Sequence, residues 1–340
     1  MLLTLPPEIL QIIVANVDDR KTLCSLLLTS RQFPLLVEPF LYARIVFPLA
    51  DRLKGLCEAL ETSNGRRAAY IRALLFVPIL SGDQPIIDKI LMTMVNLESL
   101  DIYIMITALP IFLYQRPPFA LTRFHCMCNC LHPDIFRFLE SQTSLETIHL
   151  PLASPISDPP PVFSPTSFPR LKNLMAESKV IPAFLRTSAR IEHLRVRLGD
   201  DINSTSHDWD DASMSSVRTL SCTIAYAGKS LATRFPNLEW LELVDRNSAA
   251  FLQRWNPETH KLRGIRMPHS KPDGDPIDFS SVFDAIPTLE FVEHSYKSTT
   301  AVKRWYRGDS SPTIVQWLCK LDKEWLVDWE KDVVVPSFVP

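Results

Sequence analysis

Four stretches of six residues decide the fold: LESLDI (97–102), LETIHL (145–150), IEHLRV (191–196) and LEWLEL (238–243). Each stretch has apolar side chains at its first, fourth and sixth positions and a polar side chain at its fifth. This alternation is typical of a short strand that buries one face. Recurrence of the same pattern along the chain indicates a repeating structural unit.

Six weaker copies of the pattern fill the intervals between these four. They start at Ile71, Leu121, Leu171, Val217, Leu262 and Leu289. The ten starts lie 20 to 27 residues apart, which resembles the interval of about 20 to 29 residues in leucine-rich repeats. One unit cannot bury its apolar face alone. We therefore expect an α/β fold in which about ten stacked units form a curved solenoid over residues 46–300, with a parallel sheet on its concave side.

The connections between these strands are expected to be irregular. Residues 180–189 and 248–255 suit helical return segments, whereas seven prolines in 151–169 predict an extended loop. The stretch DDINSTSHDWDD (200–211) has five aspartates and is expected to be a solvated loop.

Side chains at positions three, five and seven of each unit alternate with the core positions and are expected to point outward from the concave strands. They make up the predicted target-binding face: Asp101, Tyr103, Arg123, His125, His149, Arg195, Arg197, Trp240, Glu242, Arg266, Phe291 and Glu293. Tryptophan, tyrosine and arginine are frequent anchors of protein interfaces.

Residues 1–45 do not follow the repeat and predict three short helices. Pro6 and Pro7 suit the first turn of a helix, and Asp18 or Asp19 can cap the second. The third helix is expected after Ser30, and Pro34 is expected to shorten or delay it.

LPPEILQIIVANV (5–17), DDRKTLCSLLLTSRQF (18–33) and VEPFLYARIVF (37–47) resemble the F-box family in order and spacing. The resemblance implies that residues 1–45 dock the Skp-type linker of cullin–RING ubiquitin ligases. The linker-binding residues that it implies are Leu5, Pro6, Ile9, Leu10, Ile13, Leu23, Leu26 and Leu27. The alternative is that the three helices only cap the solenoid.

An F-box followed by leucine-rich repeats implies a substrate-recognition adaptor of an SCF-type (Skp–cullin–F-box) ubiquitin ligase. Such an adaptor is not an enzyme, needs no cofactor and binds an unidentified protein target. The alternative function is a leucine-rich-repeat interaction scaffold that acts outside ubiquitination.

Charge, hydropathy and cysteine content disfavour several other classes of protein. The net charge of −2, from 36 basic and 38 acidic residues, disfavours nucleic-acid binding. The apolar run 102–114 is shorter than the roughly 20 residues of a membrane helix. Seven cysteines without a signal-peptide pattern suit reduced thiols. We therefore expect a soluble protein of the cytoplasm or nucleus.

The stretch HCMCNCLH (125–132) contains zinc-ligand residue types. The repeat register instead predicts that Cys126 is a core residue and that Asn129 bonds backbone in a turn. No metal site is expected. GxSxG, HExxH, GxGxxG and GxxxxGK[ST] motifs do not occur in the sequence.

Residues 301–340 are expected to cap the open end of the solenoid, because a terminal repeat exposes an apolar face. Ile314, Trp317, Leu318 and Leu321 occur there at helical spacing. A target-binding tail is the alternative.

Overall fold

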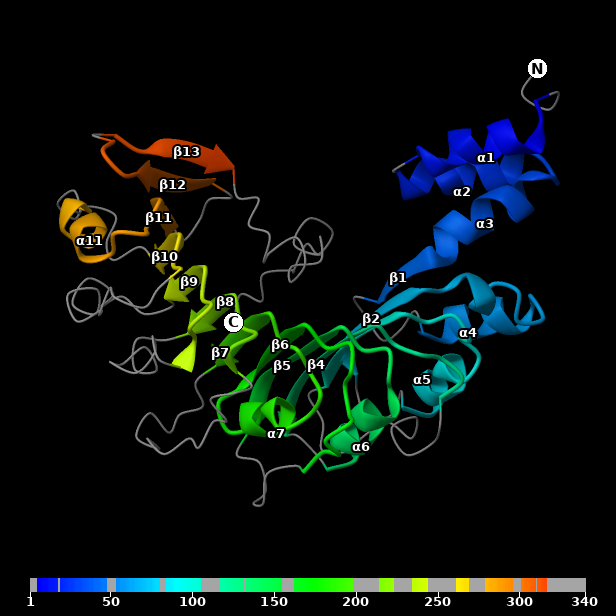
Figure 1. Cartoon of the computed structure of the whole chain (residues 1–340). Helices are drawn as coiled ribbons and strands as arrows, with labels where there is room; N and C mark the ends of the chain where they lie inside the picture. Colours follow the sequence, from blue (N-terminus) through cyan, green and yellow to red (C-terminus); the bar gives the residue numbers. More distant parts are fainter. Residues whose placement is uncertain are drawn as a thin grey trace, which may run out of the picture. The chain divides into compact units, whose positions relative to one another are not determined.

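A computed structural model describes thirteen strands and eight α-helices (Figure 1). The described residues are 5–17, 19–47, 53–79, 84–104, 117–130, 133–154, 162–197, 214–222, 234–243, 261–268, 279–295, 301–309 and 311–316. By its internal contacts the chain divides into two units, Met1–Pro159 and Pro160–Pro340. The protein is α/β, and its strands pair mostly in parallel.

Three helices open the first unit: α1 (Pro7–Ala15), α2 (Arg20–Thr29) and α3 (Phe33–Ala43). Asp19 caps α2, because its carboxylate accepts hydrogen bonds from the backbone amides of Lys21 and Thr22. The expectation that Pro34 would shorten the third helix is wrong. Pro34 lies in the first turn of α3, where a missing amide donor breaks no helical hydrogen bond.

Five parallel strands follow in the first unit, each paired with the next along the chain. They are β1 (Arg44–Phe47), β2 (Ala73–Ile79), β3 (Ser99–Ile104), β4 (Arg123–Cys130) and β5 (Thr147–Ser154). Strand β1 begins directly after α3 and pairs with β2, although the sequence pattern did not predict it.

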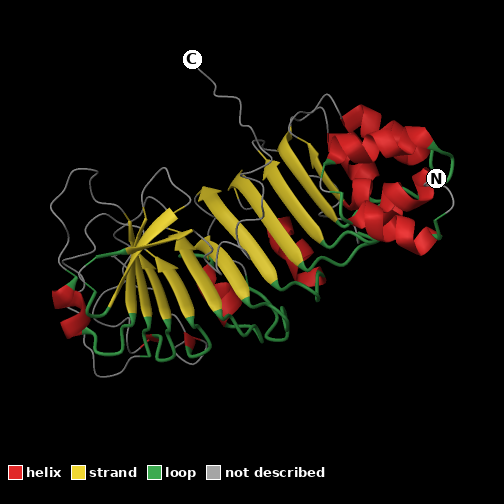
Figure 2. Cartoon of the chain, turned by 90° about the horizontal axis from the view of Figure 1, so that it is seen from above, coloured by secondary structure: helices red, strands yellow, loops and turns green. Residues whose placement is uncertain are grey.

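The second unit has eight strands. Figure 2 draws the strands of the chain as yellow arrows. They are β6 (Asn173–Glu177), β7 (His193–Arg197), β8 (Thr219–Cys222), β9 (Trp240–Leu243), β10 (Gly264–Pro268), β11 (Phe291–Ser295), β12 (Ala301–Tyr306) and β13 (Thr313–Gln316). Strands β6 to β11 pair in parallel, whereas β12 and β13 form an antiparallel pair added to β11.

The repeat register is confirmed by the ten strands from β2 to β11. Each begins two residues after a predicted start, and the side chains at positions one, four and six of all ten copies are buried. Backbone hydrogen bonds follow the same period: the carbonyl of Arg72 accepts from the amides of both Glu98 and Ser99, at 2.8 and 2.9 Å. The carbonyls that accept two amides in the same way are those of Glu98, Thr122, Lys172, Glu192, Arg218, Glu239 and Arg263.

The remaining helices lie between the strands. They are α4 (Leu53–Glu61), the short η3 (Ala68–Tyr70), α5 (Gln84–Leu91), α6 (Pro133–Ser141), α7 (Ile181–Leu185) and α11 (Ser280–Ala285). The ring of Phe138 in α6 lies 5.5 Å from that of Phe124, a core residue of β4. Helix α6 therefore covers the apolar side of its strands and leaves the other side of the strands to polar residues.

Several local expectations need correction. The helix expected at 180–189 is only the five residues of α7. The loop expected at 151–169 starts later, because β5 continues to Ser154. Asn129 lies within β4 rather than in a turn, and Ile314 lies in β13 rather than in a helix. Residues 200–211, 248–255 and 317–340 lie outside the described residues.

A buried carboxylate joins the three helices to the segment after α4. Glu38 in α3 is 2% exposed; Arg67 Nε donates to its Oε1 at 2.9 Å, and Arg66 Nη2 lies 2.8 Å from its Oε2. The guanidinium of Arg67 also lies over the ring of Tyr42. Because a buried charge is costly unless it is paired, these contacts hold the three helices in one position relative to the first strands.

Gly264 in β10 gives a test of side-chain packing. A Cβ there would lie 2.5 Å from atoms of the Trp240 ring and 2.8 Å from the Phe291 ring. We expect Gly264→Ala to lower the free energy of unfolding by about 1 to 3 kcal/mol, measured by urea titration. Gly55→Ala is the matched control: nothing lies near its Cβ, and in α4 it should stabilise by about 0.5 to 1 kcal/mol. Equal effects of the two substitutions would contradict this packing.

Candidate functional site

An apolar surface on the three N-terminal helices is the first candidate site. Ile9 and Ile13 are each 43% exposed and Ile12 is 59% exposed, all on α1. Leu28 at the end of α2 and Leu35 in α3 are also exposed. These five side chains, here called the N-terminal apolar surface, are half of the ten large apolar side chains exposed among the described residues. Three of them come from the single helix α1, and contiguous apolar patches are typical of interaction sites, which makes these helices a candidate interaction site.

The residues implied to bind the linker fall into three groups. Pro6, Ile9 and Ile13 are exposed, and Leu5, Leu26 and Leu27 are half-buried. Leu10 and Leu23 instead belong to the helical core, with Val14, Phe33 and Val37. The side chains of Leu10 and Leu23 are thus turned away from the surface that a partner would touch. Ile12, Leu28 and Leu35 are also exposed on these helices, although the resemblance does not single them out.

The second candidate site is the polar face of the strands, which is the face opposite the core positions. Of the predicted target-binding residues, Arg123, Arg195, Trp240, Glu242 and Phe291 are half-buried there. The buried ones are Asp101, His125, His149, Arg266 and Glu293. The side chains of Tyr103 and Arg197 lie outside the described residues. Alternation along a strand predicts the direction of a side chain but not its exposure.

In the first unit, Asp101, His125 and His149 stand side by side across β3, β4 and β5. The Asp101 Oδ1 atom lies 3.3 Å from His125 Nδ1, and the rings of His125 and His149 meet edge to face at 5.3 Å. The row is therefore held together by contacts between neighbouring strands.

In the second unit, the polar face contains an arginine–aromatic cluster made of Trp240, Arg266, Phe291, Glu293, Arg304 and Tyr306. Both oxygens of the Glu293 carboxylate are used: Oε2 accepts from Arg266 Nη2 at 2.8 Å, and Oε1 accepts from Arg304 Nε at 3.0 Å. The guanidinium of Arg304 lies 4.4 Å from the centre of the Phe291 ring. Arg266 lies over Trp240 at 5.7 Å.

These contacts make the cluster a rigid surface, because each charge has a fixed partner. Arg304 and Tyr306 were not predicted, since they belong to the antiparallel strand β12 and lie outside the repeat. Their pairing with β11 brings Tyr306 opposite Phe291 and Arg304 opposite Glu293.

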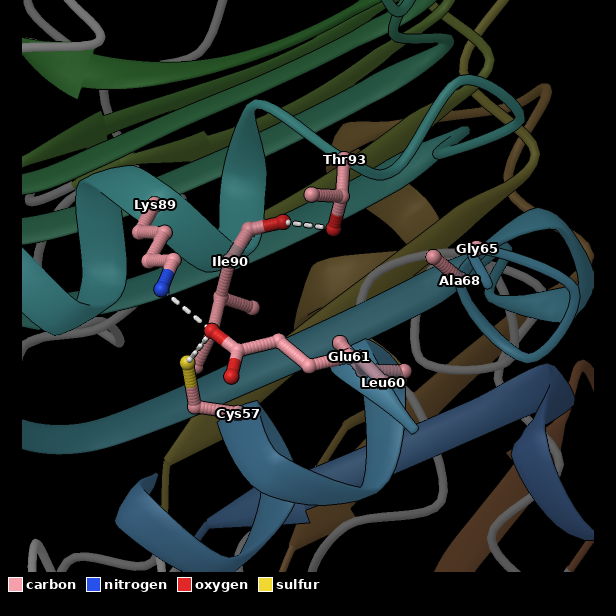
Figure 3. A pocket seen from close by; sticks show the side chains of 8 residues that line it. All are labelled: Cys57, Leu60, Glu61, Gly65, Ala68, Lys89, Ile90 and Thr93. Carbon is pink, nitrogen blue, oxygen red and sulfur yellow. Dashed lines mark hydrogen bonds and ion pairs between the residues drawn. The ribbon is translucent and has the colours of Figure 1, made fainter. Parts of the chain in front are cut away.

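A pocket of about 110 Å³ between α4 and α5 is the third candidate (Figure 3). Leu60, Ala68 and Ile90 form its apolar part. At its edge Cys57 Sγ donates to Glu61 Oε1 at 3.4 Å, and Lys89 forms an ion pair with the same carboxylate.

Burial and then the hydrogen bond to Glu61 raise the pKa of the Cys57 thiol above its ordinary value of 9.0. The pKa of Lys89 is also raised, by its hydrogen bond to Glu61. A nucleophile requires the opposite shift in either group. The pocket therefore lacks an activated thiol or amine.

No metal centre is formed by the described side chains, since they contain no group of three or more His, Cys, Asp or Glu that could hold an ion. Cys126 is a buried core residue, as its register predicts. The side chains of Cys128 and Cys130 lie outside the described residues. Within the described ranges, no helix is long and apolar enough to cross a membrane.

Comparison with known proteins adds no family to this description: neither a family model nor a curated protein matches the chain.

The raised pKa of Cys57 gives a pH-dependent test. Because only the thiolate reacts, the rate of Cys57 alkylation by iodoacetamide should still be rising at pH 9.0, near the ordinary thiol pKa. Peptide mass spectrometry of the full chain measures this rate. Glu61→Gln removes the neighbouring negative charge and should speed the reaction at about pH 8. A rate that is already constant above about pH 7 would show a thiol of low pKa and would contradict the raised pKa of Cys57.

Proposed function

We propose that this chain is a substrate-recognition adaptor of an SCF-type ubiquitin ligase. In this proposal the three N-terminal helices form an F-box that binds a Skp-type linker through the N-terminal apolar surface. The strands form a leucine-rich-repeat solenoid whose polar face binds the target protein. The observation that carries the proposal is the exposure of Ile9, Ile12 and Ile13 on a helix whose sequence resembles the F-box.

The two sides of α1 support separate structural and binding roles for its apolar side chains. Burial of Leu10 and Val14 stabilises the helices, while Ile9 and Ile13 remain available on the adjacent side of α1. Ile9 and Ile13 each leave 43% of their surface exposed, and Ile12 leaves 59%. Burial of this remaining surface against a partner is favourable, and the full transfer of such a side chain from water is worth about 1.5 to 3 kcal/mol. A partner that covers this surface therefore accounts for the apolar area that the fold leaves exposed.

The Glu38 ion pairs also suit an adaptor. Arg66 and Arg67 hold α3 against the segment that leads into β2, and Arg20 donates to the backbone carbonyls of Leu41 and Arg44 where α3 becomes β1. A ligase adaptor works by holding a target at a defined distance from the transfer chemistry, so a fixed junction is favourable. A scaffold outside ubiquitination remains the alternative, with a different partner on the same apolar surface.

The linker-binding claim is tested with a purified Skp-type linker and the full chain. The double substitution Ile9→Asp and Ile13→Asp places two charges on the N-terminal apolar surface, and we expect linker affinity to fall by about tenfold or more in titration calorimetry. Because Ile9 and Ile13 are each 43% exposed, the thermal unfolding midpoint of the variant is measured in parallel, and the affinities are compared at a temperature at which both proteins are folded.

Val95→Asp is the matched control, since Val95 is 52% exposed but lies outside the three helices. It should bind the linker like the unmodified chain. A linker that does not bind the unmodified chain at all would support the scaffold alternative. Unchanged affinity of the double variant would show that the linker does not bind through the N-terminal apolar surface.

A further inference from the structure

Charged side chains of the second unit stand in one row on the polar face of the strands. The register places Arg195 of β7 beside Ser221 of β8, and Ser221 beside Glu242 of β9. Arg266 of β10 and Glu293 of β11 continue the row. The sign of the charge alternates along the row, and the uncharged Ser221 separates the first arginine from the first glutamate.

The far end of the row is satisfied by its own contacts. Arg266 donates two hydrogen bonds to Oε2 of Glu293, at 2.8 and 3.1 Å, and Arg304 of β12 donates to the other oxygen. Glu242 lies at the margin of this network, because its Oε1 is 3.7 Å from Arg266 Nη1, which is beyond hydrogen-bond distance. The side chain of Glu242 is 18% exposed, against 2% for Glu293. The carboxylate of Glu242 therefore retains free acceptor positions.

The near end of the row has polar groups without partners. Arg195 is half-buried, and its guanidinium forms no hydrogen bond or ion pair with the described residues. Ser221 is 2% exposed, and its Oγ has no hydrogen-bond partner in the part of the chain that the structure describes. Buried polar groups without partners cost stability. A guanidinium, a hydroxyl and a carboxylate are thus available on three adjacent strands.

The charges at this end of the row disfavour ligands of a single sign. Strands β7 and β9 are two strand spacings apart, about 10 Å. A polyanion that pairs with Arg195 would be repelled by Glu242 over this distance, and a polycation that pairs with Glu242 would be repelled by Arg195. A ligand with one charge of each sign satisfies both groups.

We propose that Arg195, Ser221 and Glu242 bind an extended segment of the target protein in which an acidic and a basic side chain lie three residues apart. The acidic side chain pairs with Arg195 and accepts a hydrogen bond from the Ser221 hydroxyl. The basic side chain pairs with Glu242. This inference rests on the proposed target-binding role of the polar face and names the chemistry that it recognises.

The spacing of the strands determines the interval between the two charges. A segment in the polyproline II conformation rises about 3.1 Å per residue and completes one turn in three residues. Side chains three residues apart therefore lie on the same side of the segment and about 9 Å apart. This separation matches the distance of about 10 Å between β7 and β9, so a segment that crosses the strands can contact both ends of the site.

The probes are blocked peptides with a neutral fluorophore that contain Glu-Pro-Pro-Lys or Lys-Pro-Pro-Glu between neutral residues, because proline favours the polyproline II conformation. Binding to the full chain is measured by fluorescence anisotropy at low ionic strength. The order of charges that binds more tightly serves as the reference peptide. We expect the reference peptide to bind about tenfold more tightly than Glu-Pro-Pro-Glu and Lys-Pro-Pro-Lys peptides, in which one charge is repelled.

Arg195→Glu changes the sign of one end of the site. Two carboxylates then face the peptide, so we expect Lys-Pro-Pro-Lys to become the tightest ligand and the reference peptide to bind about tenfold more weakly. Arg195→Met and Glu242→Gln should each remove the preference for mixed charge. Arg218→Met is the matched control: Arg218 is exposed and pairs with Glu239, so all the affinities should stay unchanged.

Thermal unfolding separates recognition from a structural role. Because Arg195 has no partner among the described residues, Arg195→Met should leave the unfolding midpoint within about 2 °C of the unmodified chain while it removes the peptide preference. A much lower midpoint together with an unchanged peptide preference would overturn the inference.

Three further outcomes would also overturn it: no binding of any peptide at about 1 mM, equal affinity for mixed and like charges, or an unchanged preference in both Arg195 variants. Linker affinity of Arg195→Met is measured in parallel. Normal linker binding without a peptide preference rejects only this inference, whereas a peptide preference without linker binding rejects only the ligase role.

Discussion

The fold depends on one constraint: no repeat unit can bury its own apolar face. Positions one, four and six of every repeat are buried, because neighbouring repeats stack on one another. The backbone contributes to the stacking, since in eight of the ten repeats the carbonyl at position two accepts two amides of the next repeat. Both requirements recur at the same interval, so side-chain burial and backbone hydrogen bonding select the same register. Polar residues then occupy the opposite face of the strands.

Much of this fold could be predicted from sequence because its signal is local and repeated. Leu97, Leu100 and Ile102 specify a strand without knowledge of any other residue, and nine further copies do the same. Strand β1 could not be predicted, since Ile45 begins no copy of the pattern and becomes a strand only by pairing with β2. Ile314 was expected in a helix for a related reason: its spacing is helical, but pairing with β12 determines its conformation.

The candidate sites were predicted less completely, because exposure depends on packing. The resemblance assigns Leu10 and Ile13 to the same surface, whereas the packing of the three helices buries Leu10 and exposes Ile13. On the strands, alternation gives the correct face for Arg266 and Glu293 but cannot show that they pair with one another and with Arg304. Pairing between side chains of different strands requires the register, which is a tertiary property.

Hydrogen-exchange mass spectrometry of the full chain, with and without a purified Skp-type linker, tests the adaptor role most directly. The linker should slow amide exchange in peptides from α1, α2 and α3 and leave the strands from β2 to β11 unchanged. Protection confined to the strands, or no protection at saturating linker, would contradict the proposal that the three N-terminal helices are the ligase-docking module.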